Sequence, residues 1–174
     1  SVKSQFWQNL DNQNENIKYI HSTKQYTIGD KRNLMCVLSK SDYMLFLRHP
    51  AWLWLKKNDP SKLIPITTSV QQRMNTGYEF EKHAEQLFLA AIKIGFADID
   101  EYNAMLSRTS AAWLGGAKCV IQGKYQFGEI TCITDILEND GYGYILTEIK
   151  SSSSSKPEHE LDLAFQKVVL EGAG

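Results

Sequence analysis

Apolar residues recur at helical spacing in the first half of the chain. Residues 39–42 have the S-x-x-D form of a helix N-terminus, and the apolar residues that follow predict two short helical pieces kinked at Pro50. Thr68 or Ser69 is expected to cap a longer helix that runs to about Ile94. Its predicted buried face holds residues at helical spacing, namely Phe80, Ala84, Leu87 and Ala91.

Strand-like patterns replace the helical spacing in the second half. A weaker helical segment over residues 97–113 is closed by Gly115 and Gly116. The strands expected after it form a short antiparallel meander and cover residues 119–121, 125–127, 130–137 and 142–149. A capping box over residues 155–158 then predicts a final helix. Its expected buried stripe is Leu161, Ala164, Phe165 and Val168. The order of elements indicates an α/β domain with a small central mixed β-sheet flanked by helices.

Composition is that of an ordinary globular domain. Apolar residues make up 43% of the 174 residues and charged residues 22%. Residues 1–37 are polar and are interpreted as an N-terminal appendage to a domain over residues 38–174. The chain has neither an apolar run long enough to span a bilayer nor the pattern of a signal peptide, so we expect no membrane partner and a cytoplasmic location.

Charge and cysteine content limit the kinds of binding site expected in this chain. Nineteen basic residues against twenty acidic ones produce no global positive field, so nucleic-acid binding would depend on local lysines and arginines. Cys36, Cys119 and Cys132 are odd in number, widely spaced and set in apolar segments. Because no CxxC pair exists, they are interpreted as buried thiols and not as ligands of zinc or of an iron–sulphur cluster.

Three charged residues in the predicted strands stand out. The two-residue period of a strand puts Glu148 and Lys150 on one face, and Asp135 is the only charge within residues 130–137. A hairpin would bring Asp135 beside them. Two carboxylates suit Mg²⁺, and a lysine can orient water or offset charge on a phosphoryl transition state. The alternative interpretation is an ordinary ion pair at a strand end with Asp135 accepting backbone hydrogen bonds.

The order of these segments resembles that of a known family. The matching segments lie between Ser39 and Gly174: residues 39–43, 76–81, 135–138, 148–152 and 162–166. The chain resembles the RecB-like PD-(D/E)XK nucleases, and most of all a bacterial branch related to the CRISPR-adaptation exonucleases. This resemblance implies a restriction-endonuclease-like core and Mg²⁺- or Mn²⁺-dependent hydrolysis of DNA phosphodiester bonds.

The resemblance also implies roles for individual residues. Asp135 stands at the metal-binding aspartate, Glu148 and Lys150 form the (D/E)-x-K pair, and Gln166 is the glutamine of the following helix. The early helix contributes a metal ligand four residues after a glycine, which is Glu81 here. The implied metal ligands are therefore Glu81, Asp135 and Glu148, with Glu79 as a competing candidate on the helix.

The chain departs from the family pattern at several places. His49 lies near the position of a cluster-binding cysteine, and the terminal cysteines are lacking, so we expect no iron–sulphur cluster. Leu170 replaces the tyrosine of the Q-x-x-x-Y motif, and Thr134 replaces the proline before the aspartate. Relatives continue with further sheet, so the domain is expected to be truncated, with a possible further C-terminal domain.

A few further residues are weaker candidates for contact with substrate or nucleic acid. His159, Asp162 and Gln166 share one face of the last helix, where His159 and Asp162 could contact substrate, although a surface role for His159 is equally compatible. Trp52 and Trp54 lie beside Lys56 and Lys57, a mixture typical of single-strand-binding surfaces. For the tryptophans the core interpretation is preferred. The alternative function is a catalytically inactive nucleic-acid-binding or interaction module with the same fold.

Overall fold

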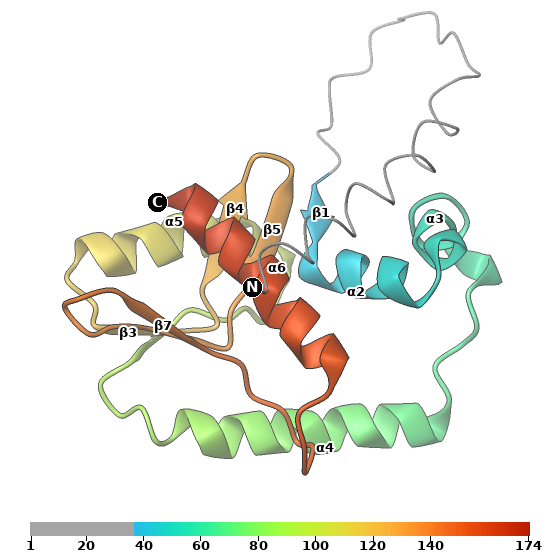
Figure 1. The fold of residues 1–174 in the computed structure, drawn as a ribbon, viewed down its shortest axis with the longest axis horizontal. Coiled ribbons are helices and arrows are strands. Elements are labelled where there is room, and N and C mark those ends of the chain that lie inside the picture. The colour runs from blue at the N-terminus through green and yellow to red at the C-terminus, as the bar shows by residue number, and fades with distance from the viewer. Residues whose placement is uncertain (1–36) are drawn as a thin grey trace, which may run out of the picture. The chain divides into compact units, whose positions relative to one another are not determined.

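The computed structural model describes residues 37–174 (Figure 1), so Cys36 and almost all of the expected appendage lie outside the described residues. Helices flank two mixed sheets, which confirms the predicted α/β class. The elements in chain order are β1 (Leu38–Ser39), α2 (Lys40–Arg48), α3 (Pro50–Asn58), the 3₁₀ helix η1 (Pro60–Lys62), α4 (Thr68–Glu85), β2 (Ile92–Lys93), α5 (Ile99–Leu114), β3 (Cys119–Ile121), β4 (Lys124–Phe127), β5 (Ile130–Ile133), β6 (Ile136–Asn139), β7 (Tyr144–Thr147) and α6 (Pro157–Ala173).

The predicted start of α2 and the kink at Pro50 are both confirmed. The Ser39 hydroxyl accepts a hydrogen bond from the Asp42 backbone N–H at 3.2 Å, and the Asp42 carboxylate accepts one from the Ser39 N–H at 3.1 Å. Pro50 begins α3, where its missing N–H removes no helical hydrogen bond. His49 separates the two helices in an extended conformation, so the chain turns between them.

Helix α4 is shorter than predicted, and only part of the predicted face is buried. Its N-cap is Thr67 and not the predicted Thr68 or Ser69, and it ends at Glu85, because the chain then turns into β2, which pairs in parallel with β3. The expected buried residues Phe80 and Leu87 are 48% and 81% exposed. The other two predicted residues, Ala84 and Ala91, do pack against the four-stranded sheet, together with Phe88. That contact rotates Glu81, which is on the same side, towards the sheet.

Strands β3–β4 and β5–β6 form one long antiparallel ribbon that bends sharply in the middle. Ile121 lies opposite Ile136 and Lys124 opposite Ile133, so the register is unchanged across the bend. Hydrogen bonds from the Gln122 N–H to the Asp135 carbonyl and from the Thr134 N–H to the Gly123 carbonyl, both 2.9 Å, hold the two strands together there. The strand predicted over residues 130–137 is therefore continuous in register but bent at Asp135.

The bend divides the strands into two sheets where the sequence predicted one. The three-stranded sheet has the order β1-β5-β4 and the four-stranded sheet the order β2-β3-β6-β7. Each contains one parallel pair, β1–β5 and β2–β3, in addition to antiparallel pairs, which confirms a mixed arrangement. Gln122 has a positive φ of 53°, and a Cβ at Gly123 would come within 2.9 Å of Val120. The turn thus depends on a backbone that most side chains would oppose.

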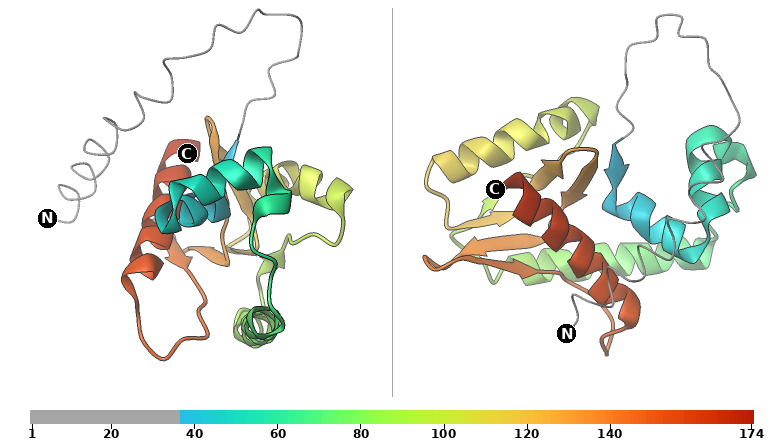
Figure 2. Two further views of the ribbon diagram at one scale, coloured as in Figure 1. Left: turned by 90° about the vertical axis from the view of Figure 1, so that its right-hand side faces the viewer. Right: turned by 45° about the horizontal axis from the view of Figure 1, so that its top comes forward.

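The start of α6 differs from the expected capping box. Lys156 is the N-cap residue and its side chain makes no capping hydrogen bond, whereas His159 Nδ1 accepts one from the Lys156 N–H at 3.3 Å. Pro157 lies in the first turn, as predicted, and is the first helical residue. The buried residues of the helix are Asp162, Phe165, Gln166 and Val169, so only Phe165 of the predicted stripe is among them. Phe165 and Val169 pack on the three-stranded sheet, against which α6 lies (Figure 2).

Burial confirms the prediction for two cysteines and contradicts that for the tryptophans of α3. Cys119 and Cys132 are buried free thiols. Trp52 and Trp54 are 39% and 60% exposed, because α3 packs mainly on α2 and η1. Across residues 37–174, every helix is too short or too polar to cross a membrane.

Core packing around α5 provides a test of the fold. Met105 is fully buried against Ile94, Ala112 and Val120. We expect Met105→Ala to lower the free energy of unfolding by about 2–5 kcal/mol, through lost apolar burial and a residual cavity. Leu114→Ala in the same helix, at a residue that is 89% exposed, should change it by less than about 0.5 kcal/mol. Urea denaturation of both variants measures the difference, and equal losses would contradict the packing described.

Candidate active site

The predicted site residues converge from three parts of the chain. Asp135 lies at the bend of the long ribbon, while Glu148 and Lys150 follow directly after β7. Asp162 and Gln166 come from the buried side of α6. The structure therefore brings together all four predicted catalytic residues together with Asp162, and we refer to these five as the Glu148 cluster.

The hairpin β6–β7 places Asp135 beside Glu148, as the sequence predicted. Its register pairs Ile136 with Thr147, so the next residues outward on the two strands are Asp135 and Glu148. The Asp140 carboxylate accepts the Tyr142 and Gly143 N–H groups at 2.9 and 2.8 Å and thereby shapes the turn. The Asp135 carboxylate in turn accepts the Ile149 N–H at 2.7 Å. It is thus bound to the backbone between Glu148 and Lys150.

The Glu148 side chain is only 3% exposed. Its two oxygens lie 3.0 and 3.2 Å from Lys40 Nζ, and one of them also pairs with Lys150. Gln166 Nε2 donates to the second oxygen at 2.8 Å. Two ammonium groups and one amide therefore surround a single buried carboxylate.

Asp162 shares all three of these donors. Lys150 Nζ lies 3.0 Å and Lys40 Nζ 3.2 Å from its carboxylate oxygens, and Gln166 Nε2 donates to it at 3.0 Å. Gln166 is fully buried, and its Oε1 atom has no hydrogen-bond partner among the described residues. Asp162 and Gln166 thus hold the two lysines and Glu148 in a fixed arrangement.

Charges in the cluster influence each other's protonation. Burial and then the charge of Glu148 raise the pKa of Asp135 to about 6. Burial opposes the charge on Lys150, but the hydrogen bond and charge of Glu148 outweigh it and raise the pKa of Lys150. The pKa of Lys40 is raised in the same way by Glu148, Asp162 and Asp135 against burial. Both lysines are cations at neutral pH.

Lys40 is a member of this arrangement that the sequence interpretation missed. It was seen only as part of the capping box over residues 39–42, where it is the first residue of α2. The capping bonds of Ser39 fix the helix start, and from there the Lys40 side chain reaches Glu148, which is 108 positions away in sequence. The spacing of residues along the chain carries no signal for such a contact.

The two candidate ligands on α4 differ in their surroundings. Glu81 is half-buried, and burial followed by the charge of Glu148 raises its pKa. Glu79 is exposed, and its hydrogen bond from Lys82 lowers its pKa. Glu81 is therefore the one whose charge is coupled to the cluster.

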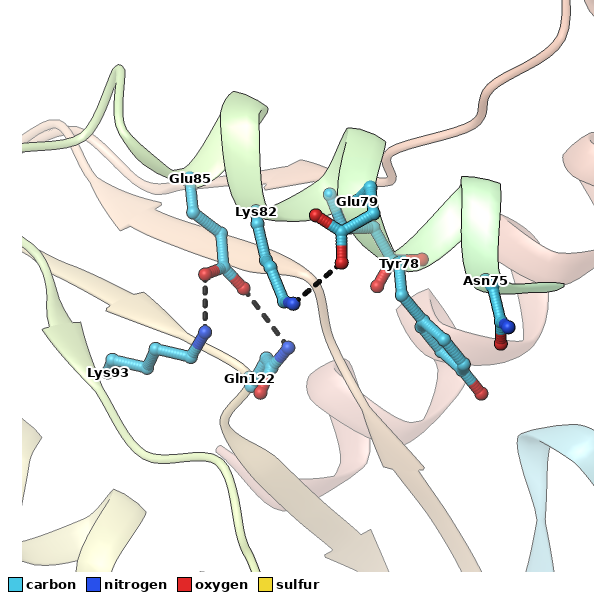
Figure 3. Close-up of a pocket in the computed structure, with 8 residues that line it drawn as sticks. Asn75, Tyr78, Glu79, Lys82, Glu85, Lys93 and Gln122 are labelled. Atoms are coloured by element: carbon cyan, nitrogen blue, oxygen red, sulfur yellow. Dashed lines mark hydrogen bonds and ion pairs between the residues drawn. The ribbon is translucent and has the colours of Figure 1, made fainter.

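A pocket of about 410 Å³ lies on the α4 side of the cluster, and Glu81 is among its lining residues. Glu85 pairs with Lys93 and accepts a hydrogen bond from Gln122 Nε2 at 3.0 Å, which joins α4 to the bend of the ribbon (Figure 3). In the same view the Tyr78 ring projects from the side of the helix and away from Glu85. The pocket gives solvent a route to Glu81.

His159 has a different place from Asp162 and Gln166. Its Nδ1 atom accepts the Lys156 N–H at the start of α6, one turn before Asp162. This contact assigns His159 a part in capping the helix. A substrate contact by His159 stays a prediction.

The donor set of the cluster can be compared with the needs of a divalent cation. Carboxylate oxygens of Asp135, Glu148 and Glu81 are hard ligands of the kind Mg²⁺ prefers. Burial, and after it the charge of Glu148, raises the pKa of Asp135 and of Glu81, and a bound cation would offset both effects. Within residues 37–174, however, these side chains are not already grouped as a set of metal ligands. The three carboxylates are suitable ligands for a cation, although the Glu148 carboxylate is already paired with lysines.

Comparisons with protein-family models, curated proteins and solved structures give no match to this chain. The resemblance to PD-(D/E)XK nucleases therefore stays a prediction from its motifs.

The raised pKa of Asp135 predicts how stability depends on pH. Its ordinary value is 3.8, so between about pH 4 and pH 6 the folded protein keeps a proton that the unfolded chain has released. The free energy of unfolding should fall as pH rises through this window, and the loss is complete above it. The Asp135→Asn side chain still offers an oxygen to the Ile149 N–H but cannot ionise. This fall in the free energy of unfolding is therefore absent from the variant. We expect it to be more stable than wild type near pH 7.5 and equal to it near pH 4.

Urea midpoints measured in EDTA at several pH values test this expectation. Glu129→Gln removes an exposed carboxylate outside the cluster and serves as the control, with little change expected. A constant difference between Asp135→Asn and wild type at all pH values would show that burial of the Asp135 charge is not the cause.

Proposed function

We propose that residues 38–174 form a Mg²⁺- or Mn²⁺-dependent nuclease domain that hydrolyses the phosphodiester bonds of DNA. The observation that carries this proposal is the convergence of Asp135, Glu148 and Lys150 at one point, with Gln166 and Asp162 beneath them. The motif order supports it independently, because the same residues were selected from sequence alone. A cytoplasmic location is part of the proposal.

The residues divide into those that would hold a cation and those that act on substrate. Asp135, Glu148 and Glu81 would be the ligands. A bound divalent cation lowers the pKa of an attacking water and offsets charge on the phosphoryl group. Lys150, a cation 35% exposed at the edge of the cluster, can orient that water or neutralise developing charge, but cannot accept its proton. Asp162 and Gln166 position Lys150 and Glu148.

The same contacts favour a second candidate. Glu148 is already compensated by Lys40, Lys150 and Gln166, so the cluster can also act as a purely structural ion-pair network. The domain would then be a non-catalytic module that binds nucleic acid or another protein.

A cleavage assay distinguishes these functions. We expect the domain to cut labelled single- or double-stranded DNA in Mg²⁺ or Mn²⁺ and to lose at least about 100-fold in rate as Asp135→Asn or Lys150→Ala. Asp140→Asn and Lys118→Ala make the same changes at exposed positions and should retain the rate. Binding of DNA without cleavage would favour the non-catalytic module, and neither binding nor cleavage would favour the structural network.

Lys40 provides a test that does not depend on turnover. Its ammonium group lies against carboxylates that a cation would also contact, so we expect Lys40→Met to bind Mn²⁺ about tenfold more tightly than wild type, as lost charge repulsion predicts. Lys118→Met, which removes an exposed ammonium group outside the cluster and its pocket, is the control. Electron paramagnetic resonance of free Mn²⁺ measures the affinity. Equal affinity in all three proteins would show that no cation binds beside Lys40.

A further inference from the structure

The three-stranded sheet has one apolar and one largely polar face. Tyr125, Ile130 and Cys132 point to one side, where they pack with Phe165 and Val169 of α6. The register aligns Ser39, Thr131 and Gln126 in one row across the other side, and Lys124 lies two residues from Gln126 on that same side. This polar row is the floor of a pocket of about 320 Å³.

Basic side chains from two directions surround this pocket. Lys56 and Lys57 reach it from α3, and Lys124 rises from its floor beside Tyr102 of α5. The one carboxylate in the lining belongs to Asp42, so three ammonium groups face a single negative charge. The pocket lining therefore carries a net charge of about +2, in a chain whose formal net charge is −1.

Asp42 holds two of the ammonium groups in place. Its side chain is 3% exposed, and its oxygens lie 2.6 Å from Lys56 Nζ and 2.7 Å from Lys57 Nζ. The Lys56 and Lys57 side chains remain 40% and 35% exposed. Each ammonium group has three N–H donors and the carboxylate takes up only part of them. Two cations are thus fixed at neighbouring positions with donors still open to solvent.

Lys124 differs from these two. Its Nζ atom lies 3.6 Å from the centre of the Tyr102 ring, and among the described residues no carboxylate forms an ion pair with it. The face of an aromatic ring attracts a cation, but it has no charged oxygen that could accept a hydrogen bond as a carboxylate does. Lys124 is therefore the cation of the pocket that lacks an anionic partner.

We propose that this pocket, lined by Lys56, Lys57 and Lys124 over the polar row of the sheet, binds a phosphate group. Three ammonium groups around one small space suit a multiply charged oxyanion, whose oxygens can accept from several lysines at once. Ser39 and Gln126 add neutral polar groups at the floor. The phosphate can belong to a small molecule or to a polynucleotide strand. The site contains no residue of the Glu148 cluster, so it does not depend on the proposed nuclease activity.

Titrations in EDTA, without any divalent cation, test this site. Inorganic phosphate and a 5′-phosphorylated oligothymidylate are added to the ¹⁵N-labelled chain at constant ionic strength, and backbone amide shifts are followed. The Thr131 and Gln126 signals should move. We expect Lys124→Met to weaken binding about tenfold, as the loss of a charge-assisted hydrogen bond predicts, and Lys124→Arg to restore most of it. Lys118→Met, which removes a lysine outside the pocket, should bind as wild type does.

The two ligands separate the sources of phosphate. Tighter binding of the oligonucleotide, with a salt dependence whose slope falls by about 1 in Lys124→Met, identifies a polynucleotide strand. Binding of inorganic phosphate alone identifies a small molecule. Lys124 makes no ion pair whose loss would unfold the protein, and thermal denaturation of each variant checks this. The proposal is overturned when neither ligand shifts the Thr131 and Gln126 signals, or when Lys124→Met and Lys118→Met weaken binding equally.

Discussion

A negative charge buried at Glu148 is the constraint on which the rest of the structure depends. An ionised carboxylate that leaves water must be paired and hydrogen-bonded, since otherwise its burial costs on the order of several kcal/mol. Lys40, Lys150 and Gln166 supply these partners from three separate segments. The start of α2, the end of β7 and the middle of α6 are consequently tied to one point. The contacts that form the candidate site are therefore also the contacts that hold these elements together.

The bent ribbon explains why Asp135 takes part. A straight strand over residues 130–139 would stay within one sheet, whereas the bend moves its second half into the four-stranded sheet. Asp135 sits at the bend, where its carbonyl still accepts the Gln122 N–H and its side chain reaches the backbone after β7. Because Asp135 is buried and Glu148 lies beside it, ionisation of the Asp135 carboxyl is disfavoured, which raises its pKa. A perturbed pKa of this kind is typical of sites that act on a ligand.

The first turn of α2 links the Glu148 cluster to the basic pocket. Lys40 and Asp42 are two residues apart and point in different directions, so Lys40 enters the cluster while Asp42 pairs with Lys56 and Lys57. Lys40 compensates the charge of buried carboxylates in the Glu148 cluster, and the buried Asp42 carboxylate compensates the charge of lysines in the basic pocket. The N-cap at Ser39 fixes the position of both, which gives a short capping box an influence on two distant surfaces.

The sequence alone determined the local features of this protein. Residues 39–42, Pro50 and the pattern of the strand region identified helix starts, a kink and a hairpin, because capping, proline geometry and side-chain alternation act within a few residues. The same alternation selected Glu148 and Lys150, and the hairpin added Asp135. Gln166 and Asp162 were selected through the resemblance and through helical spacing.

Only the tertiary structure decided which faces are buried and which charges meet. Phe80 of α4 and Leu87 just after this helix are exposed because the sheet packs against Ala84, Phe88 and Ala91, and Trp54 is exposed because little of the described chain covers α3. Lys40 joined the cluster through a contact across 108 positions. Such outcomes depend on how separate elements dock, and docking is set by the summed shape and charge of many residues, which no local pattern encodes.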